Sequence, residues 1–431
     1  MLSAPCSPRS KASRGQVLLP AFFILTLLFC AGAQAQAAEH IVHSGESIAA
    51  AIAAADKGDV VRVLGGEYHE NLRIDKPLSL IGVDRPIVRG GMTGDVVRVT
   101  SPDVTIEGFI IADSGADLGA QNAGIYIQPG ADRAVVRNCD FSYTLFGLWI
   151  EGVADVRIED NLITGKRDLS SVRRGNGIEL YNTQGAQIIG NQISFTRDGI
   201  YVDVSHHALF RNNKIHDARY GTHYMNSNEN TWEGNEVYHN RGGLALMEVR
   251  DQTVRHNRVW GNTDHGIMLR TIQDSTVEGN YLADNVRGLF VYDAEYNTLR
   301  NNTIVHNRVG VHLWGGSIHN EVEGNDFVGN QEQVRYTGTR DETWGAKEGN
   351  YWSNYLGWDR DGDGIGDVPY VASDLVDRLT WRYPMFKLLL ASPAVQTLRL
   401  VSQQFPVLRA PSVVDPKPHM RPEHDEWNIH P

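Results

Sequence analysis

The sequence contains very little cysteine. Three cysteines occur in 431 residues, and two of them, Cys6 and Cys30, lie in an N-terminal segment with the features of a secretory signal. Only Cys139 would remain in the mature chain, so an intramolecular disulfide is excluded there. Cys139 directly follows a repeated asparagine and lies beside apolar runs. This setting favours a packed thiol over a metal ligand.

The chain also lacks an excess of positive charge. Its 40 Lys and Arg residues stand against 52 Asp and Glu residues, which gives a net charge of −12. A nucleic-acid groove needs a basic stripe, and none is present, so we expect no nucleic-acid partner. After residue 38 no run reaches the ~20 apolar residues that a membrane-spanning helix requires. We therefore expect membrane association only through a partner.

Residues 1–38 are predicted to be a secretory signal peptide. Arg9, Lys11 and Arg14 form a basic start, and residues 17–29 form an apolar core. Small residues allow cleavage after Ala35 or Ala37. The apolar core is shorter than a membrane span, which argues against a retained anchor.

Glycines recur at a nearly constant interval through the middle of the chain. Most steps are 22 or 23 residues, one is 30, and each glycine opens a short apolar alternation. Two series of asparagines run in phase with the glycines. A period near 22 residues predicts an all-β solenoid, a right-handed parallel β-helix in which each strand pairs with its counterpart one coil away. The glycines are Gly124, Gly147, Gly177, Gly199, Gly221, Gly243, Gly266, Gly288 and Gly310; the asparagines are Asn138, Asn161, Asn191, Asn213, Asn235, Asn257, Asn280, Asn302 and Asn325, with Asn240, Asn262, Asn285, Asn307 and Asn330 in the second series.

The remaining segments divide the chain further. Residues 39–82 are expected to form an N-terminal cap and the first strands, with an Ala-rich helix over 47–55 that has Ser47 or Ser44 as N-cap. Residues 83–350 are the β-helix repeats, and 351–370 form an acidic Asp/Gly loop. Residues 371–410 carry short apolar helices, and 411–431 are expected to be an extended or disordered tail rich in Pro, Asp and His.

The positions two and four residues after each glycine are expected to face outward, because the first and third positions are apolar and face the core. The outward positions are rich in aromatic residues and methionine. Among them, His223 and Met225 share one strand, Met247 stacks on Met225 one coil later, and Met268 lies diagonally one coil further. Thioether and imidazole ligands together select Cu(I). The alternative is that the methionines form an adaptable protein contact.

A second candidate metal site lies in the acidic loop. Asp359, Asp361 and Asp363 alternate before Gly364, as carboxylates do in the EF-hand calcium loop. The twelfth position of that loop is Tyr370 in place of the expected Glu, and Asp367 is expected to substitute for it. The pattern predicts a structural Ca²⁺; a solvated acidic turn is the alternative.

Parallel β-helices also carry polysaccharide lyases, hydrolases and epimerases. Asp203, His206 and Glu179, with the outward aromatic residues, are candidates for acid/base work on a glycan. Acidic residues do not stack in pairs on consecutive coils, however, and the Asp-Pro-His-Asp motif of mannuronan epimerases is absent. An enzyme is therefore the second hypothesis.

The non-repeating C-terminal segment resembles the NosD family of nitrous-oxide reductase maturation proteins. The resemblance is carried by residues 348–355 (EGNYWSNY), 357–359 (GWD) and 361–370 (DGDGIGDVPY), and it continues at 382–384, 392–394 and 413–418. It extends over essentially the whole mature chain, although the repeats alone are shared by many β-helix proteins.

This resemblance implies a periplasmic, non-enzymatic accessory protein. Such proteins work with an ABC-type ATPase and permease and with a copper chaperone lipoprotein, and together they supply copper to nitrous-oxide reductase. The resemblance implies that residues 371–410 dock on the permease. It assigns no copper ligands, so His223, Met225, Met247 and Met268 are predicted from spacing alone.

Overall fold

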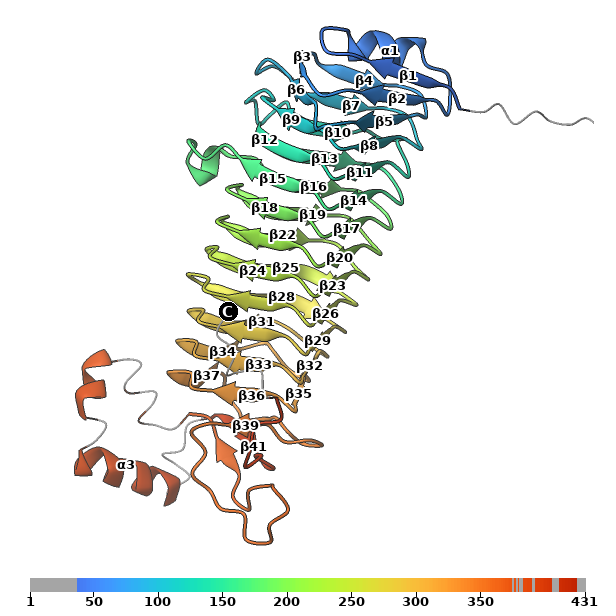
Figure 1. Ribbon diagram of the computed structural model, residues 1–431. Coiled ribbons are helices and arrows are strands. Elements are labelled where there is room, and N and C mark those ends of the chain that lie inside the picture. The colour runs from blue at the N-terminus through green and yellow to red at the C-terminus, as the bar shows by residue number, and fades with distance from the viewer. Residues whose placement is uncertain are drawn as a thin grey trace, which may run out of the picture. The chain divides into compact units, whose positions relative to one another are not determined.

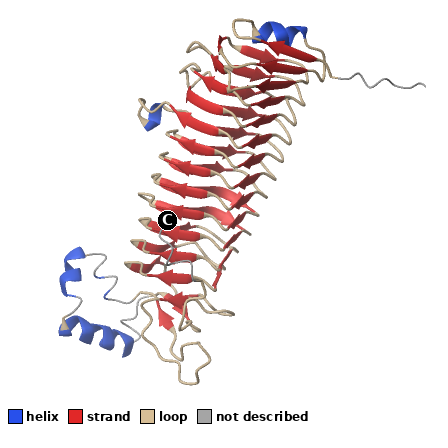
Figure 2. Cartoon of the chain, viewed as in Figure 1, coloured by secondary structure: helices blue, strands red, loops and turns tan. Residues whose placement is uncertain are grey.

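The computed structural model describes residues 37–373, 376, 379, 383–389, 392–404 and 411–424. The predicted signal peptide lies almost entirely outside these residues. The described chain winds into stacked coils, with helix α1 (Ile48–Ala54) at one end (Figures 1 and 2). Three parallel sheets run the length of the stack, because each full coil gives one strand to each sheet. The prediction of a parallel β-helix is confirmed.

Sheet A has 13 strands, from β1 (Glu39–Val42) and β2 (Val60–Val63) to β35 (Glu321–Glu323). Sheet B has 13, from β3 (Glu67–His69) to β36 (Asp326–Val328) and β39 (Tyr351–Trp352). The third sheet, C, has 12: β4 (Leu72–Ile74), β7 (Val97–Val99), β10 (Ala123–Ile127), β13 (Phe146–Glu151), β16 (Ile178–Tyr181), β19 (Asp198–Asp203), β22 (Tyr220–Met225), β25 (Gly242–Arg250), β28 (His265–Gln273), β31 (Arg287–Tyr292), β34 (Val309–Trp314) and β37 (Glu332–Thr337).

The repeated glycines are required by close packing at the start of the sheet C strands. A Cβ added at Gly221 would overlap a methyl group of Val237 and lie 3.0 Å from the carbonyl oxygen of Gly243, one coil away. Any larger residue would push the strand away from the core. The 22-residue period of the sequence is therefore the length of one coil.

Helix α1 (Ile48–Ala54) covers the first coil. Ser47 is its N-cap and accepts a hydrogen bond from the amide of Ala50, and Ile48 and Ile52 are buried against the coil. The carboxylate of Glu70 accepts bonds of 3.0 Å from the amides of Ile48 and Ala49, where the helix dipole favours negative charge. The predicted cap is confirmed.

The asparagine series forms a hydrogen-bonded ladder inside the solenoid. Each side-chain oxygen accepts from the amide and side chain of the asparagine one coil earlier, as Asn235 does from Asn213 at 2.9 and 3.0 Å. The prediction was wrong at the first member. Asn138 is exposed with φ 51°, and the buried Cys139 occupies the ladder position, where its amide donates to Asn161. Cys139 is a packed thiol, as predicted.

The C-terminal end of the stack is closed by three short strands, which we call the C-terminal clasp. They are β38 (Glu342–Thr343), β40 (Tyr370–Val371) and β41 (Val413–Asp415), with β41 in the middle. Asp415 is fully buried and ends the ladder, because its Oδ2 accepts from the amide and side chain of Asn350 and from the indole of Trp352 at 2.9–3.0 Å.

The tail was expected to be extended or disordered. Residues 413–415 are extended, as strand β41, and the described segment 411–424 is ordered by contacts with residues 39 to 98 positions earlier in the chain, beyond the reach of local pattern. Before it come the 3₁₀ helix η2 (Pro384–Leu389) and helix α3 (Pro393–Gln404). Among the described residues no helix is long and apolar enough to cross a membrane.

Candidate functional site

The outward face of sheet C carries the predicted copper residues. Leu244 and Leu246 of β25 are fully buried in the core, and the residues between and after them, Ala245 and Met247, point outward. Register pairing stacks Met225 on Met247, while Met268 stacks on Ala245 and so lies diagonally from Met247. The predicted neighbourhood is confirmed.

These residues form one apolar cluster on the surface of the solenoid. Ala245, Met247 and Met268 make its centre, and Met225, Tyr220 and Phe290 pack against them. Met247 is 8% exposed and Met268 9% exposed. Met225, Met247 and Met268 come from three successive coils, and adjacent coils are ~4.8 Å apart. We call this set the methionine cluster.

His223 borders the methionine cluster on one side. Its Nδ1 lies 3.3 Å from the carboxylate of Asp198 and 3.3 Å from Arg219, and its ring meets Tyr201 edge-on at 4.9 Å. Burial would raise the pKa of Asp198, but hydrogen bonds from His223 and Arg219 outweigh it and hold the pKa below its usual value. The Nδ1 side of the ring is therefore fixed, and Nε2 is the nitrogen left for other contacts.

Sequence reasoning missed an additional outward column. The residue just before each repeated glycine also points outward, because the glycine itself faces the core. Asp198 and Tyr220 belong to this column, and so does His265, which is 2% exposed. The outward positions predicted from the sequence lie two and four residues after each glycine, and His265 occupies neither of them. Counting one position before the glycine would have placed His265 on the same face as the methionines.

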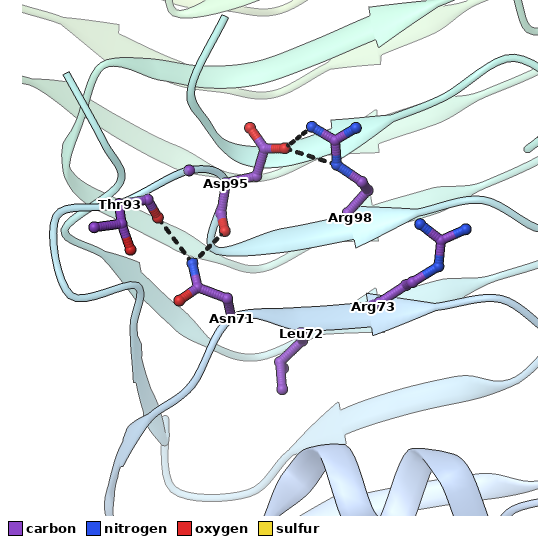
Figure 3. Close-up of a pocket in the computed structure, with 7 residues that line it drawn as sticks. Asn71, Leu72, Arg73, Thr93, Asp95 and Arg98 are labelled. Atoms are coloured by element: carbon purple, nitrogen blue, oxygen red, sulfur yellow. Dashed lines mark hydrogen bonds and ion pairs between the residues drawn. The ribbon is translucent and has the colours of Figure 1, made fainter. Parts of the chain in front are cut away.

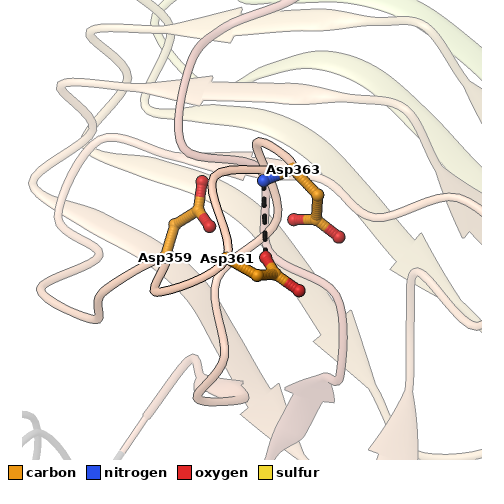
Figure 4. Close-up of side chains that lie close together, drawn as sticks. All are labelled: Asp359, Asp361 and Asp363. Carbon is orange, nitrogen blue, oxygen red and sulfur yellow. Dashed lines mark hydrogen bonds between the residues drawn. The ribbon is translucent and has the colours of Figure 1, made fainter.

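The acidic loop brings three of its four predicted carboxylates together. Oxygens of Asp359, Asp361 and Asp363 lie within 4.8 Å of one another (Figure 4). Asp359 accepts from the amides of Gly364 and Gly362, and these bonds lower its pKa. Asp367 lies outside this trio and accepts from the amide of Arg360 at 2.8 Å.

The candidate catalytic residues are held apart by their local bonds. Glu179 is buried and accepts from the side chain of Asn176, and burial raises its pKa to about 8. Asp203 accepts from the side chain of Asn226 at 3.1 Å. His206 lies in the turn beyond the sheet, where its Nδ1 accepts from the amide of Asn228. The imidazole is thus committed to the turn and not to the outward face.

A shallow pocket at the N-terminal end of sheet C was not predicted. Arg73 and Arg98 stand side by side on paired strands, and Arg98 is bound to Asp95 at 2.9 Å (Figure 3). Asn71 closes one wall by donating to the carbonyl oxygens of Thr93 and Asp95. Arg98 also lies over the ring of Tyr126, so its charge is already satisfied.

The fold and the outward face of sheet C together define a parallel β-helix protein with a thioether-rich outer surface. Residues 159–357 match a family described as periplasmic copper-binding protein (NosD), and residues 45–244 match a family of unknown function, DUF1565. A probable ABC transporter binding protein NosD from Stutzerimonas stutzeri is 38% identical over 84% of this chain and 86% of its own length. The namesake from Pseudomonas aeruginosa is 39% identical over 83% and 87%. The chain belongs to the NosD family.

Solved structures are similar in fold alone. The A-module of a mannuronan C-5 epimerase from Azotobacter vinelandii has a TM-score of 0.55 at 17% identity, covering 71% of this chain and 93% of its own. A surface adhesin of Streptococcus pneumoniae has a TM-score of 0.55 at 12% identity, covering 68% and 88%. One is an enzyme and one an adhesin, so the fold does not decide the function.

Proposed function

We propose that the chain is a non-catalytic periplasmic accessory protein that delivers copper to nitrous-oxide reductase. It acts with an ABC-type ATPase and permease and with a copper chaperone lipoprotein. The description of the family as periplasmic and copper-binding supports this role, as does the naming of its relatives as ABC transporter binding proteins. The observation that carries the proposal is the packing of three methionines into one cluster on the outward face.

Copper is the cargo of this proposal, and the methionine cluster with His223 is its binding site. Thioether sulfur and imidazole nitrogen are soft and borderline ligands that prefer Cu(I) to hard cations. Met225, Met247 and Met268 supply sulfur from three successive coils, and His223 supplies nitrogen through Nε2. The carboxylate of Asp198 holds the other ring nitrogen, a common arrangement around metal-binding histidines.

Residues 371–410 form the segment that docks on the permease. Met385, Leu388 and Leu389 of η2 are exposed, between 50% and 78% of their surface. Apolar side chains gathered on one short helix are typical of a protein contact. The segment leaves from the C-terminal clasp, so the docking end and the methionine cluster lie at different heights of the same solenoid.

The proposal is tested by titrating the purified protein with Cu(I) against a chromogenic chelator. The triple variant Met225→Leu, Met247→Leu, Met268→Leu keeps the apolar packing and removes all three sulfurs. Wild type is expected to bind one Cu(I), and the triple variant is expected to lose that binding. Met92→Leu, at an exposed turn far from the cluster, is the matched control. Equal binding by wild type and the triple variant would remove the site from the proposal.

The second candidate function is a carbohydrate-active enzyme, and one observation favours it. Glu179 and Asp198 lie on paired coils of the same face, with the pKa of Glu179 raised to about 8 and that of Asp198 lowered. Carboxyl groups with separated pKa values can divide the roles of acid and base. Turnover of a polyuronate, lost in Glu179→Gln, would establish this function. A broad panel of polysaccharides without turnover would exclude it.

A structural Ca²⁺ in the acidic loop is a separate part of the proposal. Oxygen ligands from Asp359, Asp361 and Asp363 suit a hard cation. The loop leads into β40 of the C-terminal clasp, so the ion would stabilise that end of the solenoid. Asp367 is the fourth carboxylate that the sequence offers, from the far side of the loop.

A further inference from the structure

One ring nitrogen of His265 is buried and forms no hydrogen bond in the described part of the chain. The residue begins strand β28 and is 2% exposed. Its Nδ1 lies 3.7 Å from the carboxylate of Asp264, which is also bound by Arg287. Its Nε2 is buried and meets no hydrogen-bond partner among the described residues. A buried polar atom left unpaired is costly, so it calls for a physical reason.

The surroundings of His265 show where this nitrogen points. An added Cβ at Gly242, one coil earlier, would lie 2.6 Å from Nε2 of His265 and 2.6 Å from a ring carbon of Tyr220. The imidazole therefore lies over Gly242, in the space that a side chain at this position would fill. Ala245, three residues later on the same strand, is the next small residue that points outward. Nε2 thus ends beside a coil whose outward residues are Gly242, Ala245 and Met247.

Tyr220 links His265 to the methionine cluster. The ring of Tyr220 lies 5.7 Å from that of His265 and 5.6 Å from that of His223, so the two histidines flank one tyrosine. Tyr220 packs against Ala245, Met247 and Met268. Each histidine has a carboxylate at Nδ1, and each has Nε2 as its remaining nitrogen.

We propose that Nε2 of His265 is a further ligand of the Cu(I) bound at the methionine cluster, with Asp264 as the residue that positions the ring. This assignment rests on the proposed copper-binding function. In the tautomer with the proton on Nδ1, facing Asp264, Nε2 offers its lone pair to the metal. A carboxylate on the distal nitrogen fixes the tautomer and strengthens the ligand. The site then has a buried nitrogen donor as well as the more exposed His223.

The alternative is that His265 only fills space next to Tyr220. The two are separated by Cu(I) affinity, measured by chelator competition, and by the number of nitrogen ligands from copper K-edge X-ray absorption. His265→Ala is expected to lower the affinity at least ~10-fold and to remove one nitrogen from the copper spectrum. Asp264→Asn is expected to lower the affinity ~10- to 100-fold while the nitrogen count is kept. His69→Ala, an exposed histidine on sheet B, is the matched control.

Gly242→Ala is a second variant, for the case that His265→Ala loses copper only because it fails to fold. It keeps His265 but places a methyl group 2.6 Å from the present position of Nε2, so the ring must shift and the affinity is expected to fall although no ligand type is lost. Circular dichroism and the melting temperature confirm that each variant is folded. Unchanged affinity and nitrogen count in His265→Ala would overturn the assignment. If wild type itself binds no Cu(I), the proposed function fails before the question of His265 arises.

Discussion

The asparagine ladder allows a quantitative prediction about one coil. The side chain of Asn235 accepts from the amide and side chain of Asn213 and donates to Phe210 and to Asn257, at 2.8–3.0 Å. Asn235→Ala removes these four bonds and leaves buried groups unpaired. At ~1 kcal/mol for each bond, the variant is expected to lose roughly 4 kcal/mol of unfolding free energy. Urea unfolding followed by circular dichroism measures the loss.

The loss is expected to be concentrated in neighbouring coils, because coils of a solenoid contact only their neighbours. Hydrogen exchange should therefore show the weakest protection in β21 (Lys214–His216) and β24 (Glu236–Tyr238). The control is Asn138→Gly, since Asn138 is exposed and off the ladder although it follows the sequence period. Its stability is expected to change by less than ~0.5 kcal/mol. The reasoning is refuted if both variants lose the same amount, or if Asn235→Ala loses under ~1 kcal/mol.

Three further predictions concern charge. The pKa of Glu179 is raised from 4.5 to about 8, so the native state keeps a proton that the unfolded chain has released. Stability should therefore fall by ~1.4 kcal/mol per pH unit as the pH rises through that window, and Glu179→Gln should flatten this slope in urea unfolding. Millimolar Ca²⁺ should raise the melting temperature of wild type and leave Asp361→Asn unchanged; equal shifts would contradict the calcium site. Asp415→Ala strips three buried donors of their acceptor, so limited proteolysis should cut the C-terminal clasp first, and a wild-type cleavage pattern would contradict its role.

The repeat was predictable because its period is strict. Once each glycine was fixed, alternation placed Met247 outside and Leu246 inside, and both assignments hold. The one-residue error at Asn138 arises because Cys139 takes the ladder position, so the neighbouring asparagine matches the period without belonging to the ladder. The burial of Cys139 and its hydrogen bond to Asn161 reveal the true position.

Other features depend on contacts that the sequence does not display. The residue before each glycine points outward because the glycine itself faces the core, and a count that begins at the glycine does not reach His265. The burial of Asp415 depends on Asn350 and Trp352, more than 60 residues away. The composition of residues 411–431 predicts a tail because it is rich in polar residues and proline. Composition carries no information about which strand a segment pairs with.

The antiparallel pairing of β40 with β41 determines which part of the C-terminal sequence can change in length. Ala372 donates to Val413, and Ser373 to Ser412, so the residues that begin and end the helical segment lie next to each other. The chain between them is therefore an insertion whose two ends are held together by the pairing of β40 with β41. It can lengthen, shorten or change its apolar residues while the two strands keep their register and Asp415 keeps its place. Changes in this insertion can therefore accumulate without altering the ladder or the methionine cluster.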